Sequence, residues 1–176
     1  LKRLRRLQQS LSRKNKDSSN RSKARLLTAL LHERISNQRN DFLHKTSSTI
    51  CKNQEVGTIC LEDLNVRGMV KNHKLAKSIS SASWSEFRRQ LEYKSEWNGK
   101  NLLFCDRFDP SSKVCNECGT VKDDLRLSDR TWICVCGAKI DRDLNASKNI
   151  IDFAFSKLYP EDTGNFKSVE RRDRKA

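Results

Sequence analysis

Two pairs of cysteines in the second half of the chain constrain its fold more than any other feature. Two residues separate the cysteines of the first pair and one residue separates those of the second, and a glycine follows each pair. This spacing is typical of a zinc ribbon, in which two tight turns each present two thiolates to one tetrahedral ion. The shorter second gap tightens its turn. We therefore predict one structural zinc ion bound by Cys115, Cys118, Cys134 and Cys136.

The alternative is four unligated thiols in a loop. The fifteen residues between the pairs, 119–133, contain few large apolar side chains. Apparent zinc binding of ~10–16 kcal/mol would exceed what so small a core can supply. Four protein ligands also leave no open position for a catalytic water, so any chemistry must lie elsewhere. We expect Cys51, Cys60 and Cys105 to be small core residues.

The charge of the chain is concentrated near its N-terminal end. The 176 residues carry a formal charge of +14, and residues 1–50 hold 13 Lys and Arg against 3 Asp and Glu. Such a surface favours a polyanionic partner, of which nucleic acid is the commonest and an anionic membrane the second. No segment approaches the ~18 continuous apolar residues of a membrane-spanning helix. We expect a soluble intracellular protein with no membrane partner.

The basic segment has helical periodicity. Apolar residues recur at Leu1, Leu4, Leu7 and Leu11, and after a polar break at residues 17–20 a second helix is expected over about 21–49. Its apolar stripe would consist of Ala24, Leu27, Leu31, Ile35, Phe42 and Leu43. We predict a basic helical hairpin over residues 1–50. The cations expected to contact nucleic acid are Arg3, Arg6, Arg13, Lys14, Lys16, Arg21 and, near the first cysteine pair, Lys113. The alternative is a solvated hairpin whose charges bind nothing specific.

The middle of the chain has the pattern strand, helix, strand over residues 56–106. The first apolar run is rich in β-branched residues and ends at Glu62, and residues 101–105 form a second such run. Between them, Ser83 and Glu86 have the spacing of a capping box that opens a helix packed through Trp84, Phe87 and Leu91. This order predicts a parallel pair of strands in an α/β layer.

Two acidic residues could together bind a catalytic metal. Glu62 ends the first strand, and Asp143 lies where a helix begins after the cysteine cluster. Either acid alone is more often a capping or surface residue. At the open end of an α/β sheet, however, two such carboxylates could hold Mg²⁺, and paired ions can hydrolyse a phosphodiester in one in-line step. The three histidines have no evident Ser or Cys partner for nucleophilic catalysis.

Four segments resemble the OrfB/TnpB family of insertion-sequence proteins, which are transposon-encoded RNA-guided DNA nucleases. They are residues 59–65 (ICLEDLN), 84–100 (WSEFRRQLEYKSEWNGK), 110–119 (PSSKVCNECG) and 141–146 (DRDLNA). The resemblance implies an α/β, partial RNase-H-like (RuvC-like) domain with an inserted zinc ribbon. The nuclease portion would cover residues 1–108, the ribbon 109–139, a further nuclease helix 140–159 and a disordered tail 160–176.

The resemblance also implies roles for the acids and for partners. Glu62 would be the second catalytic carboxylate and Asp143 the third, with Asp141 a neighbour, and Mg²⁺ would be the catalytic ion. The partners would be DNA and a guide RNA, in the bacterial or archaeal cytoplasm near the nucleoid. The family's first catalytic Asp, its first three strands and the N-terminal part that grips nucleic acid have no counterpart here, and Ser81 stands where relatives often carry Asp.

We therefore expect this chain to be the C-terminal part of such a nuclease, inactive in cleavage unless an N-terminal fragment supplies the missing strands. Two alternatives remain. One is a non-catalytic DNA- or RNA-binding remnant that could regulate transposition. The other is a zinc-ribbon interaction module whose basic helices only keep it in solution.

Overall fold

The computed structural model describes residues 2–126 and 128–158, so the tail predicted to be disordered lies outside the described residues. Over these residues helices and strands are both present, and two separate two-stranded sheets form. The elements are α1 (Lys2–Ser12), α2 (Ser19–Lys52), β1 (Thr58–Glu62), α3 (Val66–Met69), α4 (Ala76–Ala82), α5 (Trp84–Trp97), β2 (Asn101–Cys105), β3 (Thr131–Ile133), β4 (Lys139–Asp141) and α6 (Arg142–Ser156). In outline they follow the predicted mixed α/β order.

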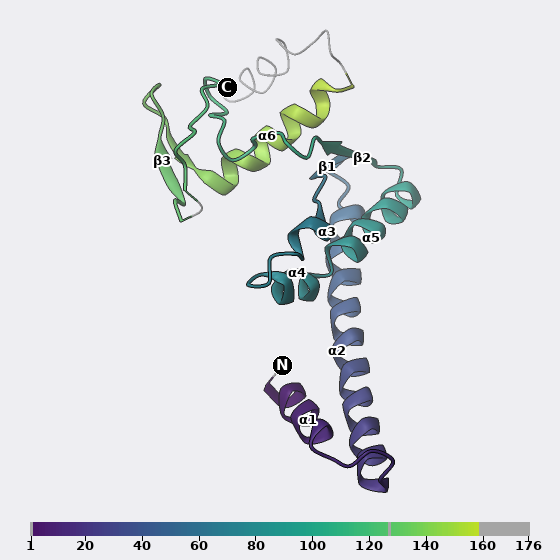
Figure 1. Cartoon of the computed structure of the whole chain (residues 1–176). Coiled ribbons are helices and arrows are strands. Elements are labelled where there is room, and N and C mark those ends of the chain that lie inside the picture. The colour runs from purple at the N-terminus through teal and green to yellow at the C-terminus, as the bar shows by residue number, and fades with distance from the viewer. Residues whose placement is uncertain (1, 127, 159–176) are drawn as a thin grey trace.

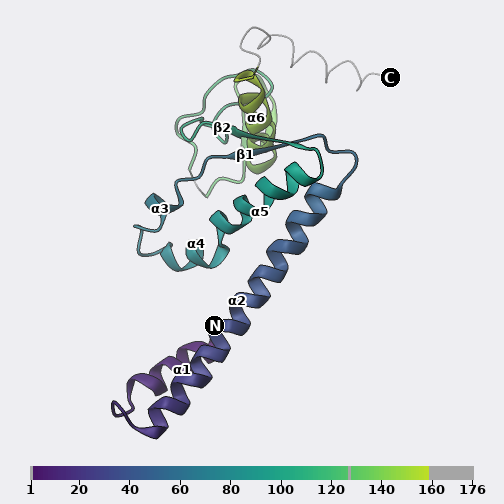
Figure 2. The ribbon, with the colours of Figure 1, turned by 90° about the vertical axis from the view of Figure 1, so that its right-hand side faces the viewer.

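The basic segment forms a helical hairpin in which α1 folds back along the first part of the long α2 (Figures 1 and 2). Ser18 caps α2 by accepting a hydrogen bond from the Arg21 backbone. The buried stripe of α2 includes Ala24, Thr28 and Leu43. Leu27 and Phe42, which we expected in that stripe, are exposed. The buried positions repeat every four residues, as at Ala24 and Thr28, because such residues share one face of a helix, and Leu27 lies on a neighbouring face. The Thr28 hydroxyl is satisfied there by the Ala24 carbonyl.

The second half of α2 packs against α5 through a partly polar interface. Buried Gln90 and Lys94 of α5 both bond Ser47 of α2, at 3.0 and 2.7 Å. The predicted capping box is wrong. Ser83 has a left-handed backbone (φ 53°) as it joins α4 to α5 and makes no side-chain cap, while Glu86 pairs with Arg89 instead.

β1 and β2 pair in parallel, with Glu62 opposite Cys105, which confirms the predicted strand, helix, strand unit. The two strands lie between α6 on one side and α5 with α2 on the other (Figure 2). Ile59 packs with Cys51 and Leu91 in the core on the α5 side. Cys51 and Cys105 are buried as predicted, and Cys60 is half-buried.

The third region is a short antiparallel hairpin of β3 and β4 beside the cysteine cluster. Its small core contains Trp132 and Ile140 packed around Cys115 and Cys134. β4 runs directly into α6, which carries this region to the β1–β2 sheet (Figure 1). Over the residues described, no helix is long and apolar enough to traverse a lipid bilayer.

Candidate metal centre and carboxylate cavity

The four predicted cysteine ligands converge. Their sulfur atoms all lie within 4.8 Å of one another. The Cys115 and Cys136 Sγ atoms are 3.9 Å apart, and those of Cys118 and Cys134 are 3.5 Å apart. Zn–S bonds of about 2.3 Å in a tetrahedron require S···S separations of about 3.8 Å. The donor set therefore fits a tetrahedral ion, and the cluster could hold one.

Each pair of cysteines lies on a tight turn that its glycine makes possible. Gly119 donates its N–H to the Cys115 carbonyl at 2.8 Å, and Gly137 donates to the Cys134 carbonyl at 2.9 Å. Both glycines have positive φ, 80° and 86°, a conformation that disfavours residues with a Cβ. Hydrogen bonding with the side chain and backbone of Thr120 lowers the pKa of Cys118 to about 6. This favours the thiolate at Cys118, whereas burial raises the pKa of Cys115, which a bound metal would have to offset.

Asparagine side chains fasten α6 to the first cysteine turn. Asn145 accepts from the Asn116 backbone N–H at 2.9 Å and donates to the Val114 carbonyl at 2.6 Å. Asn149 donates to the carbonyls of Ser111 and Val114, both at 2.7 Å, and accepts from the Asn116 side chain at 2.9 Å. Asn145 and Asn149 are buried, whereas the apolar Ala146, Ile150 and Phe153 of the same helix are half-buried. The two buried asparagines satisfy the backbone of the ribbon, and Ala154 is the apolar residue buried beside them on this face.

The hydrogen bonds that join α6 to the ribbon extend to Glu62 at the end of β1. Ser111, which is buried, donates its hydroxyl to Glu62 Oε1 at 2.8 Å. The carbonyl of Ser111 accepts from Asn149, and Asn149 in turn bonds Asn116 between two of the cysteines. A chain of three hydrogen bonds therefore connects the metal-binding turn to Glu62.

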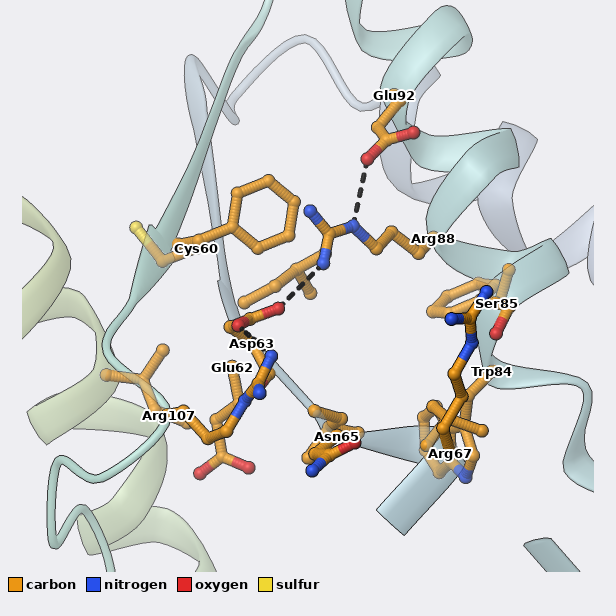
Figure 3. Close-up of a pocket in the computed structure, with 16 residues that line it drawn as sticks. Cys60, Glu62, Asp63, Asn65, Arg67, Trp84, Ser85, Arg88, Glu92 and Arg107 are labelled. Atoms are coloured by element: carbon orange, nitrogen blue, oxygen red, sulfur yellow. Dashed lines mark hydrogen bonds and ion pairs between the residues drawn. The ribbon is translucent and has the colours of Figure 1, made fainter. Parts of the chain in front are cut away.

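Glu62 borders a cavity of about 530 Å³ at the end of β1 (Figure 3). The cavity is lined by residues of β1, α3, α5 and β2 together with Ile150 of α6. Apolar side chains such as Phe87 and Phe104 form part of its wall, and three arginines lie along it. An acid at the rim of a mixed apolar and cationic cavity is a favourable place for binding an anionic substrate near a metal.

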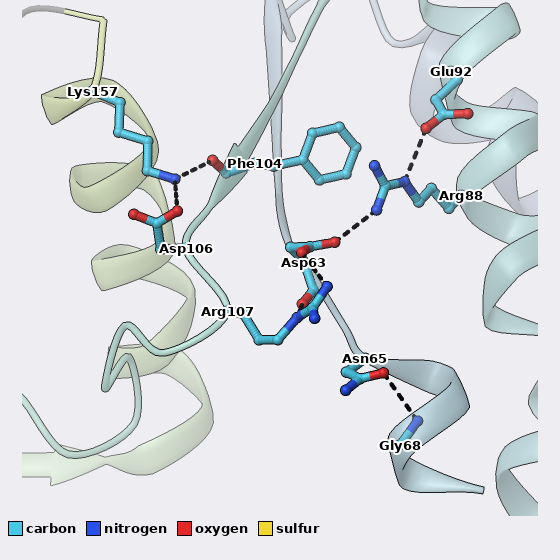
Figure 4. A network of polar contacts seen from close by, with 9 residues as sticks. All are labelled: Asp63, Asn65, Gly68, Arg88, Glu92, Phe104, Asp106, Arg107 and Lys157. Carbon is cyan, nitrogen blue, oxygen red and sulfur yellow. Dashed lines mark hydrogen bonds and ion pairs between the residues drawn. The ribbon is translucent and has the colours of Figure 1, made fainter.

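Asp63 fixes the position of two of these arginines. It pairs with Arg88 at 2.9 Å and with Arg107 at 2.6 Å (Figures 3 and 4). Hydrogen bonds from Arg107 and then Arg88 hold the pKa of Asp63 below its usual value. Arg88 also bonds Glu92 and stacks over Phe104, 4.1 Å from the ring centre. Asp63 thus ties α5 to the loop after β2, next to Glu62.

A second ion pair joins that loop to α6. Lys157 lies 2.7 Å from Asp106 and also donates to the Phe104 carbonyl at 3.2 Å (Figure 4). The loop that leaves β2 is therefore held on both sides, through Arg107 toward β1 and through Asp106 toward the end of α6.

Asp143 lies in the first turn of α6 and does not contact Glu62. It pairs with Arg142 at 2.9 Å and Arg130 at 3.2 Å, and the hydrogen bond from Arg142 is the main cause of its lowered pKa. Asp141 is the N-cap that accepts the backbone N–H of Asp143. Asp143 precedes Ile150 by seven residues, so the two share a face of α6 about 10 Å apart along its axis. Within the described residues no hydrogen bond or ion pair joins Glu62 to Asp143.

The cations predicted to contact nucleic acid differ in availability. Exposed residues among them are Arg3, Arg6, Arg13 and Lys16, and Lys14 is half-buried. Arg21 donates to the carbonyls of Leu11 and Lys14 at 3.2 and 3.0 Å, so it also closes the hairpin. Lys113 donates to the Asp123 carbonyl at 3.1 Å.

Sequence reasoning missed the residues that connect these sites. Ser111, Asn145 and Asn149 look like ordinary polar residues, although the four-residue spacing of the two asparagines on a helix indicates one shared face. Asp63 directly follows Glu62 and carries no signal of its two arginine partners, which come from distant segments. Only tertiary contacts reveal these roles.

Comparison with solved structures identifies the class of fold. The chain resembles a Cas12f1 chain from a complex with sgRNA and target DNA, with a TM-score of 0.57, 20% identity, and coverage of 73% of this chain and 38% of the other. A chain from a CRISPR-Cas12f ternary complex gives a TM-score of 0.62 at 19% identity, covering 85% and 31%. The fold is therefore that of part of a Cas12f-type chain.

Two family models place the chain more narrowly. The model described as OrfB_IS605, probable transposase, matches residues 1–73, and the Cas12f1-like TNB domain matches residues 84–150. Together with the relatives named below, these matches confirm the resemblance seen in the sequence: the chain belongs to the OrfB/TnpB family.

Curated relatives agree. A protein of Streptomyces pristinaespiralis, provisionally named an RNA-guided DNA endonuclease, is 50% identical over 149 residues, which are 85% of this chain and 37% of the relative. InsQ of Escherichia coli K12, with the same provisional name, is 36% identical over 85% of this chain and 40% of its own length. The TnpB-like protein L79 of Acanthamoeba polyphaga mimivirus is 27% identical over 74% and 25%. The chain thus spans less than half the length of these relatives.

Proposed function

We propose that the chain is the C-terminal part of a transposon-associated, RNA-guided DNA endonuclease that hydrolyses phosphodiesters with two Mg²⁺ ions. The observation that carries the proposal is the position of Glu62, at the carboxyl end of β1, on the rim of a cavity lined by arginines, with one oxygen held by Ser111. The names of the relatives and the Cas12f fold support the same substrate.

In this proposal the chain supplies two carboxylates, and an N-terminal fragment supplies the third. Bound Mg²⁺ would activate water and stabilise the leaving oxygen. Glu62 and Asp143 would hold the metal, but Asp143 is bound to two arginines and lies about two helical turns from the Glu62 cavity. In the described residues β1 pairs with β2 alone, so its other edge can accept a strand. We infer that such a strand completes the site.

The cysteine cluster would hold a structural zinc ion. The donor set is all sulfur, two of the four cysteines are buried, and the turns that present them are closed by hydrogen bonds. Zinc would act by fixing the ribbon and, through the asparagines of α6, the start of the helix that carries Asp143.

The decisive experiment joins this chain to the N-terminal portion of a relative. The N-terminal portion of the Streptomyces relative would be fused upstream of Leu1 and purified with that relative's guide RNA. Mg²⁺-dependent cleavage of a matched plasmid by the fusion is expected, with loss of at least 100-fold on Glu62→Gln or Asp143→Asn and no loss on the exposed control Glu55→Gln. Absence of cleavage by the fusion would refute the nuclease proposal. Cleavage by the 176-residue chain alone, abolished by Glu62→Gln, would refute the need for an upstream strand.

One observation favours a second candidate. Because Asp143 is exposed, paired with two arginines and about 10 Å along α6 from the Glu62 cavity, the chain could be a non-catalytic nucleic-acid-binding remnant or a regulator of transposition. In that case binding to DNA or RNA would survive the double change Glu62→Gln and Asp143→Asn, and the fusion would bind without cutting.

A further inference from the structure

Two of the four cysteines in the metal-binding cluster are open to solvent. Cys118 and Cys136 are exposed, whereas Cys115 and Cys134 are buried in the small core of the ribbon. The two exposed cysteines line the same cavity of about 410 Å³, which lies between the ribbon and the start of α6. A small molecule that enters this cavity therefore reaches one sulfur atom from each cysteine turn.

The sulfur atoms are paired across the cluster, between the two turns. The Cys118 Sγ lies 3.5 Å from the Cys134 Sγ, and the Cys136 Sγ lies 3.9 Å from the Cys115 Sγ. Each exposed sulfur thus has a buried sulfur of the opposite turn as a near neighbour. The pair of Cys118 and Cys134 is the closer of the two, so its sulfur atoms need to move least to form a bond.

We propose that Cys118 is a site of covalent modification by hydroperoxides and that its oxidation joins it to Cys134. With hydrogen peroxide, the Cys118 thiolate attacks the O–O bond, which breaks to give a sulfenic acid and one hydroxide ion. The Cys134 thiolate then attacks the sulfenic sulfur, so that the S–S bond forms and the S–O bond breaks with loss of a second hydroxide. Two thiolates have then given two electrons to one peroxide.

The disulfide removes two of the four sulfur ligands that the cluster offers to a metal. A structural zinc site needs its full set of thiolates, and binding of the ion contributes to the folding of such a small domain. Oxidation of Cys118 therefore releases the metal and loosens the ribbon. This step rests on the zinc part of the proposed function and is independent of the nuclease part.

Loosening of the ribbon reaches Glu62 through side-chain hydrogen bonds. Asn116 lies in the first cysteine turn, and its amide bonds Asn149. Asn149 donates to the Ser111 carbonyl, and the Ser111 hydroxyl donates to Glu62. Once the first turn loses its metal, Asn116 is no longer fixed and the contact of Ser111 with Glu62 weakens. The cluster thus makes the support of Glu62 sensitive to oxidants.

The test follows metal release and disulfide formation in the full chain. Zinc-loaded protein would be treated with hydrogen peroxide beside a chromophoric zinc chelator, and its disulfides would be mapped by peptide mass spectrometry. We expect release of close to one ion per chain together with a disulfide between Cys118 and Cys134. Dithiothreitol with added zinc should reverse both changes. Mapping in the unsubstituted chain does not depend on whether any variant folds.

Two matched variants separate the exposed cysteines. Cys118→His keeps a metal ligand but removes the thiol that reacts first, so zinc release should slow by about 10-fold or more. Cys136→His makes the same change at the other exposed cysteine and leaves Cys118 and Cys134 in place, so release should slow by less than about 3-fold. Cys60→Ser, outside the cluster, should release zinc at the rate of the parent chain.

Amide hydrogen exchange tests the connection to Glu62. After oxidation, residues 111–119 should exchange at least about 10-fold faster, whereas exchange in α1 should not change. Unchanged exchange over 111–119 would overturn the connection. Retention of zinc under peroxide, a disulfide within one turn, or equal slowing by Cys118→His and Cys136→His would overturn the modification site. A chain without zinc before treatment would refute the zinc assignment as well. Because no cleavage is measured, failure of the nuclease proposal alters none of these outcomes.

Discussion

Ser111 donates a hydrogen bond of 2.8 Å to Oε1 of Glu62 across 49 positions of the chain. The hydroxyl comes from the first residues of the ribbon region, and the carboxylate ends β1. The bond fixes one oxygen of the proposed catalytic acid. Ser111 is itself held by Asn149, which bonds the Ser111 carbonyl and also bonds Asn116 in the first cysteine turn. The ribbon therefore contacts the cavity through side chains and does more than interrupt the nuclease fold.

Replacing Ser111 by Ala should remove the hydrogen bond to Glu62. Because Glu62 is exposed to water, we expect a loss of about 1 kcal/mol in the free energy of unfolding at pH 7, near the lower range for bonds to charged groups. A double-mutant cycle with Glu62→Ala, which removes the acceptor, measured by urea denaturation, should give a coupling energy of about 1 kcal/mol. Strictly additive effects would show that the bond contributes nothing.

Among the asparagines that join α6 to the first cysteine turn, Asn149 should be the most sensitive to substitution. Asn149→Leu would leave the Ser111 carbonyl without its donor and the Asn116 amide with Asp152 as its one remaining acceptor, and should destabilise the chain by about 2–3 kcal/mol. The matched control Asn37→Leu changes an exposed asparagine of α2 and should stay within about 0.5 kcal/mol. The measurement is thermal and urea unfolding. A loss of stability in Asn149→Leu no larger than that in the control would show that the asparagine hydrogen bonds do not hold α6 to the first cysteine turn.

Metal content provides a third prediction. Purified protein should contain close to one zinc ion per chain, and Cys115→Ser should lose it because that sulfur lies in the core of the ribbon. Trp132, which packs against Cys115, should then shift its fluorescence to the red. Cys60→Ser, in β1, should keep the metal. A ribbon that is folded and metal-free by elemental analysis would contradict the zinc assignment.

The Glu86–Arg89 pair on α5 should produce a stability difference that depends on pH. Hydrogen bonds from Arg89 and then Gln90 lower the pKa of Glu86 to about 2. A carboxylate with a lowered pKa stabilises the fold above its unfolded value and loses that effect as the pH falls toward its folded value. Glu86→Gln should therefore cost about 1 kcal/mol at pH 6, allowing for solvent screening of a side chain that is one-third exposed. The difference in the free energy of unfolding between the parent chain and Glu86→Gln should decrease as the pH falls from about 4.5 to about 2.

Glu55→Gln serves as the reference for that comparison, since Glu55 is an exposed acid in the turn before β1. Its unfolding curve should follow that of the parent chain at every pH. A constant gap for Glu86→Gln across the pH range would mean that packing, and not the ion pair, accounts for its effect.

The sequence by itself determined the local elements and the metal cluster. Four cysteines with a glycine after each pair specify a turn whose backbone geometry is set within a few residues, and the β-branched apolar run that ends at Glu62 specifies a strand. The same local logic found the hairpin through leucines at helical spacing. It failed at Ser83, where a capping box was expected, because the chain needs a left-handed residue to join α4 directly to α5.

The tertiary structure determined which side chains are buried and which partners they contact. In α2 Thr28 is buried where we expected Leu27, and its hydroxyl bonds the Ala24 carbonyl of the same helix. In α6 two asparagines face inward beside Ala154, because their side chains satisfy backbone groups of the ribbon segment. The same reason explains why Ser111 and Asp63 were invisible in the sequence: their partners lie 25 to 49 positions away. The contribution of a polar side chain depends on the donor or acceptor that folding brings next to it, and a local sequence pattern does not contain that information.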